Sequence, residues 1–232
     1  MGASVADVLS RNGCKIALSY RTSRKPAEKI VGQLLAQGRD AMAIPCDLTR
    51  QGAIERAARQ IVRKYKRLDV LVNLSSVYEE TPLKTTALAR SAWDKHLKTN
   101  AQSAYLLSLV VAPWMNRTKG GRIVHIADWT SASGRPRYKG YSSYYVSKKA
   151  IQGVTEAMAL ELAPTILVNA IAPGPILPPP GLTARDSGAV VKATPLARWG
   201  GASEIARAVL FLVETDFVTG ETIRVDGGRH LF

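Results

Sequence analysis

The sequence predicts an α/β fold with a doubly wound parallel sheet, in one domain that spans residues 1–232. Apolar runs alternate with segments of helical periodicity from one end of the chain to the other, which is typical of parallel sheets with right-handed crossovers. Most of the runs are almost continuously hydrophobic, as expected for strands that helices cover on both faces. No internal repeat or linker interrupts this alternation, and the length suits one domain with a substantial core.

The first four elements are two helices, each followed by an apolar run. Helical periodicity predicts helices over Ala3–Arg11 and Pro26–Gln37. The runs KIALSY (Lys15–Tyr20) and AMAIPC (Ala41–Cys46) are short and apolar, which predicts buried strands.

The middle of the chain continues the pattern. A helix is predicted over Gln51–Tyr65, because its periodic segment ends in a basic cluster that suits the carboxyl end of a helix dipole. The runs DVLVNL (Asp69–Leu74) and RIVHIA (Arg122–Ala127) predict the next two strands, and a single long helix is predicted between them over Thr86–Asn116.

The last part adds two helices, two strands and one irregular tract. Helices are predicted over Ser142–Ala163 and Ser203–Glu214, and strands over ILVNAIA (Ile166–Ala172) and ETIRV (Glu221–Val225). The tract Pro173–Pro195 is rich in proline and glycine, follows a strand and is interpreted as a loop.

The composition describes an ordinary globular protein with a basic surface. The net charge is +14, but lysines and arginines are spread over the whole chain, which favours a solvated basic surface over a nucleic-acid site. No aromatic–basic strip or helix-turn-helix pattern supports nucleic-acid binding. No apolar run reaches the roughly 18 residues of a membrane span, and no secretory signal is expected at the start.

The cysteines and histidines give no sign of a metal site. Neither Cys14 and Cys46 nor the three histidines show the spacing of metal ligands, and the two cysteines form no disulfide framework. This cysteine usage fits a reducing compartment, and we expect a cytoplasmic protein without a metal.

Polar or turn-forming residues follow the predicted strands at their carboxyl ends. They include Asp47-Leu48-Thr49, Asp128-Trp129-Thr130-Ser131 and Pro173-Gly174. Because ligands of open α/β sheets bind outside the carboxyl ends of the strands, these residues indicate a site at one rim of the sheet.

Tyr144 and Lys148 are four residues apart in a predicted helix, so their side chains share one helix face. A neighbouring ammonium lowers the pKa of a tyrosine, and such a tyrosine can transfer a proton beside a carbonyl group. The spacing alone is weak, because Tyr145 and Lys149 offer the same arrangement one residue along.

Several motifs occur together and in a fixed order. They are Asp47-Leu48-Thr49, Asn73-Leu74-Ser75-Ser76, Asn100, Tyr144…Ser147-Lys148, Asn169…Pro173-Gly174 and Thr219-Gly220…Asp226-Gly227-Gly228. In this set the chain resembles the short-chain dehydrogenase/reductase family over nearly all its residues, closest to pteridine-reductase-like and 3-oxoacyl-carrier-protein-reductase-like members. The pairing of Ser147 with Lys148 selects Tyr144 over Tyr145.

The resemblance implies roles for individual residues. Tyr144 would donate or accept the proton, Lys148 would tune it and hold the nicotinamide ribose, and Asn100 would hold a water that links Lys148 to solvent. The implied cofactor-binding residues are Gly2, Arg21, Ser23, Asp47, Leu48, Asn73, Tyr144, Lys148, Pro173 and Gly174. Asp47 would face the adenine, although an acid in this position is also typical of a helix N-cap.

The position that contacts the substrate departs from the common family pattern. The family spacing from Tyr144 leads to Ser131, whereas the residue directly after the strand is Asp128, as in pteridine-reductase-like members. An ionised carboxylate accepts a hydrogen bond from an amine-bearing or protonated substrate and raises the pKa of Tyr144, which favours reduction. We expect Asp128 to contact the substrate, with Ser131 as the alternative.

The cofactor is expected to be NADP(H) rather than NAD(H). Members that bind NAD place an acid after the strand that corresponds to Lys15–Tyr20, where it contacts the ribose 2′-hydroxyl. This chain has no acid there, and Arg21 and Arg24 could meet a 2′-phosphate. The alternative is that both are ordinary exposed arginines.

The start of the chain also departs from the family. Members begin with a strand and a glycine-rich turn that cradles the pyrophosphate, and Gly2 matches only the last glycine of that turn. The resemblance therefore implies that about fifteen residues, including the central strand, are absent. We expect the 232-residue chain to bind dinucleotide weakly and to be marginally stable.

The leading hypothesis is an NADPH-dependent reductase of a small carbonyl or pterin-like compound, assembled as a homotetramer or dimer. In this hypothesis the loop Pro173–Pro195 would cover the substrate. Tyr78 and Trp129 could stack on a flat substrate or merely fill the core. The alternatives are a 3-oxoacyl-carrier-protein reductase, whose acidic carrier would suit the charge, and a non-catalytic protein that keeps the fold.

Overall fold

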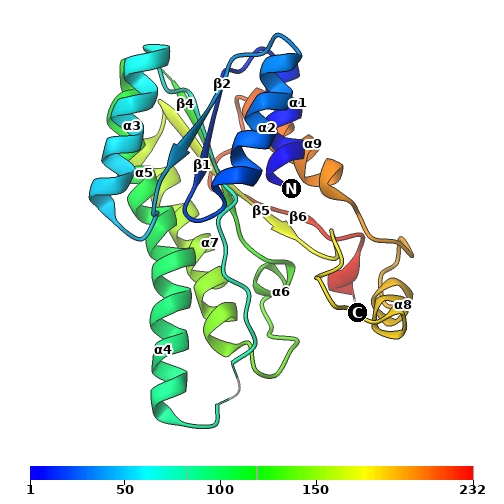
Figure 1. The fold of residues 1–232 in the computed structure, drawn as a ribbon. Helices are drawn as coiled ribbons and strands as arrows, with labels where there is room; N and C mark the ends of the chain where they lie inside the picture. The colour runs from blue at the N-terminus through cyan, green and yellow to red at the C-terminus, as the bar shows by residue number, and fades with distance from the viewer. Residues whose placement is uncertain (82, 119, 232) are drawn as a thin grey trace.

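Six parallel strands alternate with helices in the computed structural model, which describes residues 1–81, 83–118 and 120–231 (Figure 1). The strands are β1 (Ile16–Tyr20), β2 (Ala41–Pro45), β3 (Val70–Asn73), β4 (Gly121–Ile126), β5 (Ile166–Pro173) and β6 (Thr222–Val225). The larger helices are α1 (Gly2–Arg11), α2 (Arg24–Ala36), α3 (Gln51–Tyr65), α4 (Thr86–His96), α5 (Ser103–Arg117), α7 (Ser142–Leu162), α8 (Ala184–Lys192) and α9 (Ala202–Glu214). Every predicted strand is present within two residues of its expected ends, and the predicted α/β fold is confirmed.

The predicted helix over Thr86–Asn116 is divided by a π-helical turn, η1 (Leu97–Gln102). The two flanking helices, α4 and α5, are continuous with it, so only the hydrogen-bond pattern changes. Such turns insert one extra residue into a helix and re-aim the side chains that follow. Hydrophobic periodicity does not register this local change, which is why the sequence predicted one uninterrupted helix.

The tract Pro173–Pro195, which was predicted as a loop, contains the nine-residue helix α8. The Thr183 hydroxyl accepts a hydrogen bond from the Asp186 amide and caps the start of this helix. No residue of α8 is buried, and the prolines and glycines of the surrounding tract led to the prediction of a loop. A short helix that was not predicted, α6 (Trp129–Ala132), directly follows β4.

The strands form two separate sheets in the described part of the chain. β1 pairs with β2, and the other strands pair in the order β3-β4-β5-β6, with every pair parallel. Helices α1, α2 and α9 lie on one side of the sheets and α3, α5 and α7 on the other (Figure 1). This arrangement is the doubly wound layering that the alternation of elements predicted.

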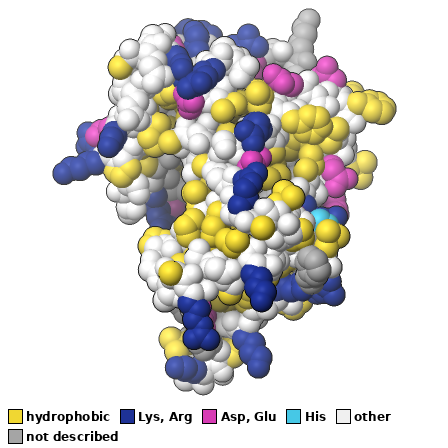
Figure 2. All heavy atoms as spheres, turned by 90° about the vertical axis from the view of Figure 1, so that its right-hand side faces the viewer, with side chains coloured by type: hydrophobic (Ala, Val, Ile, Leu, Met, Phe, Trp, Pro, Cys, Tyr) yellow, Lys and Arg dark blue, Asp and Glu magenta, His cyan; other side chains and the backbone are white. Residues whose placement is uncertain are grey.

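Basic side chains are distributed over the surface. On the face drawn in Figure 2, lysines and arginines lie apart from one another, among hydrophobic and neutral groups. Ion pairs on the surface include Arg67 with Asp69 and Lys95 with Glu79, both at 2.7 Å. No helix in the described residues combines the length and apolar character that crossing a membrane requires.

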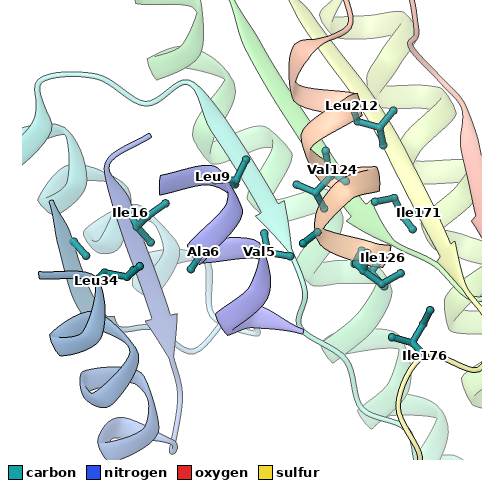
Figure 3. Packing of buried hydrophobic residues seen from close by; sticks show 14 of the residues in the cluster. Val5, Ala6, Leu9, Ile16, Leu34, Val124, Ile126, Ile171, Ile176 and Leu212 are labelled. Carbon is teal, nitrogen blue, oxygen red and sulfur yellow. The ribbon is translucent and has the colours of Figure 1, made fainter. Parts of the chain in front are cut away.

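Helix α1 joins the two sheets through side-chain packing. In Figure 3, Ala6 and Leu9 of this helix lie between Ile16 of β1 and Val124 of β4. All four side chains are buried in one hydrophobic cluster that continues into β5 and α9. The two sheets therefore share a core although no backbone hydrogen bonds connect β1 to β3.

Candidate active site

A cavity of about 430 Å³ lies at the carboxyl ends of β4 and β5. The predicted residues Asp128, Tyr144, Lys148, Pro173 and Gly174 all line it. They come from three elements, because the segments after β4 and β5 meet the first turns of α7 at this rim. The fold therefore brings together residues that are up to 46 positions apart (128 to 174) in the sequence.

The Tyr144 hydroxyl donates a hydrogen bond to Oδ2 of Asp128 at 3.0 Å. Burial raises the pKa of Tyr144 well above its ordinary value, and the charge and hydrogen bond of Asp128 raise it further. These effects outweigh the lowering of the pKa that the spacing of Tyr144 and Lys148 predicts. The phenol therefore stays protonated across the neutral range and is equipped to donate a proton.

Lys148 lies one turn after Tyr144 and is buried. Its Nζ donates to the Ile126 carbonyl at 2.7 Å and lies 5.8 Å from the centre of the Tyr144 ring. Burial lowers the pKa of Lys148 to about 8, and the negative charge of Asp128 opposes this shift. The ammonium thus occupies an apolar environment at the floor of the cavity, where its charge is poorly solvated.

This burial predicts that Lys148→Met stabilises the fold below pH 8. The folded-state pKa of Lys148 is about 8 and the ordinary value is 10.5, so at neutral pH the folded chain must bury a charge that the unfolded chain exposes to water. Removing the charge should raise the free energy of unfolding by about 2 kcal/mol at pH 7, after allowance for the lost hydrogen bond. The gain should shrink as the pH rises through the window from about 8 to 10.5.

Urea unfolding of the wild type and Lys148→Met at pH 7 and pH 10.5 measures this difference. Lys149→Met is the matched control, because Lys149 is the exposed neighbour on the same helix and should show little change at either pH. A Lys148→Met chain less stable than the wild type at pH 7 would contradict the prediction.

Asp128 and Ser131 occupy different places. Oδ1 of Asp128 accepts from the amide and hydroxyl of Thr130 at 2.8 and 2.6 Å, so the carboxylate caps α6 and holds Oδ2 toward Tyr144. Ser131 is fully buried, and its hydroxyl donates to the Asp128 carbonyl oxygen. Of the two, Asp128 is the residue that lines the cavity.

Asn100 lies in the π-helical turn and is fully buried. Its Oδ1 accepts from the Val77 amide at 2.8 Å, and its Nδ2 donates to the Val77 carbonyl and to the Ser147 hydroxyl. The side chain thereby fixes the segment after β3 against α7, one residue from Lys148. This geometry makes Asn100 a positioning residue for the cavity wall.

A groove continues from the cavity along the carboxyl ends of β1, β2 and β3. The predicted residues that line it are Gly2, Arg21, Ser23, Asp47, Leu48 and Asn73. Leu74 and Ser76 line both the groove and the cavity, so the two are contiguous. Together they form an elongated channel that suits a long ligand.

The charged residues in and near the groove differ in whether they have hydrogen-bond or ion-pair partners. Asp47 accepts from the Thr49 hydroxyl and amide, and these hydrogen bonds, with a smaller contribution from Arg21, lower the pKa of Asp47. Arg24 is paired with Glu28 at 2.7 Å and does not line the groove. Arg21 is exposed and has no ion pair in the described residues, so it is the arginine placed to meet an anion there.

Aromatic side chains form one wall of the cavity. Tyr78 and Trp129, both singled out in the sequence, line it, and Tyr78 lies 4.9 Å from Tyr144 in an edge-on arrangement. Sequence reasoning missed Tyr141, which stacks on Tyr78 at 4.8 Å, and Tyr138. Both precede α7 in a segment without helical periodicity, so no signal in the sequence marked them.

Gly174 follows β5 where the chain passes another backbone segment. A Cβ at this position would lie 2.5 Å from Cβ and 2.6 Å from Cα of Asp226. The Gly174 amide also donates to the Val225 carbonyl. Only glycine fits this close approach, which fixes the position of Pro173 and Gly174 in the cavity lining.

Among the described residues, no group of three or more His, Cys, Asp or Glu side chains is placed to hold a metal ion. His125 is fully buried, donates or accepts at the Ser108 hydroxyl, and has its pKa lowered to about 4 by burial. It is therefore neutral in the neutral range.

Known proteins share both the sequence pattern and the fold. A family profile described as "Enoyl-(Acyl carrier protein) reductase" matches residues 1–230. A 3-oxoacyl-[acyl-carrier-protein] reductase from Staphylococcus aureus is 30% identical, covering 100% of this chain and 94% of that protein.

Two solved structures are similar over nearly the whole chain. A short-chain dehydrogenase/reductase from Serratia marcescens has a TM-score of 0.89 and 31% identity, covering 99% of this chain and 93% of that one. The FolM alternative dihydrofolate reductase 1 from Brucella suis, solved in complex with NADP, has a TM-score of 0.89 and 28% identity, covering 100% and 93%.

Proposed function

This chain belongs to the short-chain dehydrogenase/reductase family, and from that premise we propose that it is an NADPH-dependent reductase of a small carbonyl or pterin-like substrate. The observation that carries the proposal is the protonated Tyr144 hydroxyl, held by Asp128 in a cavity next to Lys148. A reductase needs a proton donor at this point, whereas a dehydrogenase needs a base.

The contiguous groove and cavity fit an extended dinucleotide. Arg21 and Asp47 lie at the groove end and Lys148 lies in the cavity, so the adenosine half would occupy the groove and the nicotinamide half the cavity. The bound nicotinamide supplies the hydride. The residues of the chain then position the substrate, and Tyr144 gives a proton to the oxygen or nitrogen that gains negative charge.

Asp128 favours substrates that carry a hydrogen-bond donor. Its carboxylate has acceptor capacity only, so it binds an N–H group or a protonated imine better than a bare carbonyl oxygen. The flat wall formed by Tyr78 and Tyr141 suits a planar ring. The name of the Brucella suis relative, a dihydrofolate reductase, agrees with a pterin-like substrate.

A panel of carbonyl and pterin substrates tests the proposal by the consumption of NADPH, followed at its absorbance band. We expect turnover with at least one planar ketone or oxidised pterin. Absence of turnover across the panel, in a chain that binds NADPH, would support the non-catalytic alternative and overturn the proposal.

A 3-oxoacyl-carrier-protein reductase is the second candidate. The Staphylococcus aureus relative carries that activity in its name, and the charge of +14 suits an acidic carrier. Competition between a planar ketone and a 3-oxoacyl thioester at equal concentration distinguishes the two substrate classes.

Arg21 predicts a preference for NADP(H) over NAD(H). It is exposed in the groove, and Ser23 rather than an acid lies nearby, so a 2′-phosphate would gain a charge-assisted contact. Arg21→Ala should weaken NADPH binding about tenfold and leave NADH binding nearly unchanged. Titration of both cofactors against the wild type, Arg21→Ala and the control Arg24→Ala measures this. Equal or tighter binding of NADH by the wild type would rule the preference out.

We also propose that the enzyme is a cytoplasmic homo-oligomer, a tetramer or a dimer. Tyr105 and Leu109 share one face of α5 and are each 44% exposed, and Val146 of α7 is also exposed. Apolar faces on packed helices of this kind suit burial against a second copy. Sedimentation of the wild type and of Leu109→Glu tests whether this face holds the copies together.

A further inference from the structure

Arg137 lines the cavity from the segment between α6 and α7 and lies 5.4 Å from the centre of the Trp129 ring. Two of its guanidinium nitrogens, Nε and Nη2, are withdrawn from solvent and have no hydrogen-bond partner in the described residues. Buried N–H groups that have neither water nor a protein partner are unfavourable, since unsatisfied buried donors destabilise a protein. The environment of Arg137 is therefore incomplete without a partner.

The described residues provide no carboxylate for Arg137. None of the ion pairs found there includes Arg137. Asp128, the acid that lines the cavity, is already engaged by Tyr144 and Thr130. The positive charge of Arg137 therefore lies at the cavity lining without a counterion from the described residues.

A second arginine reinforces the positive charge at Trp129. The Arg229 guanidinium lies 5.7 Å from the centre of the same ring and donates to the Ala193 carbonyl. Trp129, which is part of the aromatic wall, therefore lies near two cations from different parts of the chain. The cavity is polarised, with the carboxylate of Asp128 beside Tyr144 and positive charge near Trp129.

We infer that the substrate carries a carboxylate, that Arg137 binds it, and that the flat part of the substrate lies against the aromatic wall. This inference rests on the proposed function, because it assigns the orientation of the substrate in the same cavity. The planar guanidinium fork matches a carboxylate through two parallel hydrogen bonds. A rotation of the side chain would turn its unpartnered edge toward such a group. The substrate class is thus a planar aromatic or heteroaromatic carbonyl acid.

A matched pair of ligands tests the charge requirement directly. 4-Acetylbenzoate and 4-acetylbenzamide have nearly the same shape and both carry a ketone, but only the first is an anion. Calorimetry on the wild-type chain should show at least tenfold tighter binding of the acid, the size expected for a charge-assisted hydrogen bond. Arg137→Gln should abolish this preference, and Arg135→Gln, a change at the exposed neighbouring arginine, should keep it.

The outcomes separate the inference from the proposed function. Equal binding of the two ligands by the wild type, no measurable binding of the acid, or a preference that survives in Arg137→Gln overturns the inference. NADPH oxidation with the same ketones is measured in parallel. A preference for the acid that Arg137→Gln removes supports the inference even when neither ketone is reduced. Reduction of both ketones, with equal affinity for the two, supports the proposed reductase function and not the inference.

Discussion

Tyr144→Phe lowers carbonyl reduction by about 100-fold or more and leaves the fold in place, because it removes the proton donor and little else. The phenol is buried, and its hydroxyl contacts Asp128 at 3.0 Å, so phenylalanine keeps the ring packing and loses only this hydrogen bond. The rate of NADPH oxidation at saturating substrate and the circular dichroism melting curve measure the two halves of the expectation.

Tyr145→Phe is the matched control, because Tyr145 also lines the cavity and has the same spacing to a lysine. It should retain most of the turnover. Asp128→Asn supplies a second readout, since Asp128 raises the pKa of Tyr144 and reduction needs the protonated phenol. When the pH is raised, the activity of Asp128→Asn should fall at a lower pH than the activity of the wild type. Full turnover in Tyr144→Phe would assign the proton donor elsewhere.

Gly174→Ala destabilises the chain by about 3 kcal/mol, near the upper end of what overpacking usually costs. The added methyl group would meet Cα and Cβ of Asp226 at 2.6 and 2.5 Å, and a backbone atom cannot rotate away. Asp226 is itself held by the Gly228 amide and by His230. Urea unfolding measured at equal protein concentration gives the free energy of unfolding for both chains.

Gly32→Ala is the opposite control. Gly32 lies in α2, is exposed, and has no atom within 4 Å of the position that a Cβ would take. Alanine there should stabilise the helix by about 0.5 to 1 kcal/mol. If Gly174→Ala unfolds at the same urea concentration as the wild type, the close approach to Asp226 is not a constraint.

The strands were predictable because each is a short apolar run, and burial on both faces imposes that composition regardless of the rest of the fold. Tyr144 and Lys148 were paired by helical spacing, a local property. The hydrogen bond from Tyr144 to Asp128 joins residues 16 apart. The rule that ligands bind at the carboxyl ends of strands indicated Asp128, and the family resemblance related Tyr144 to the same position.

The features that were missed depend on tertiary contacts or on local backbone geometry. Helix α8 buries none of its residues and lies in a tract rich in proline and glycine, a composition that favours a loop. The π-helical turn at Asn100 alters hydrogen bonding without altering hydrophobicity. Arg137 and Tyr141 belong to a segment whose path is decided by the packing of Trp129 and Tyr78, which the sequence does not state.

The division into two sheets has a mechanical consequence for a ligand that occupies both the groove and the cavity. The groove is lined by residues of both sheets, at the carboxyl ends of β1, β2 and β3, and most of the cavity lies at the ends of β4 and β5. A ligand that occupies both therefore contacts both sheets. Side-chain packing around α1, rather than backbone hydrogen bonds between strands, sets the spacing between the two sheets. A ligand that occupies both the groove and the cavity binds most tightly when its length matches the spacing between the two sheets. Core residues of α1 that line neither the groove nor the cavity, such as Leu9, thereby influence how tightly such a ligand binds.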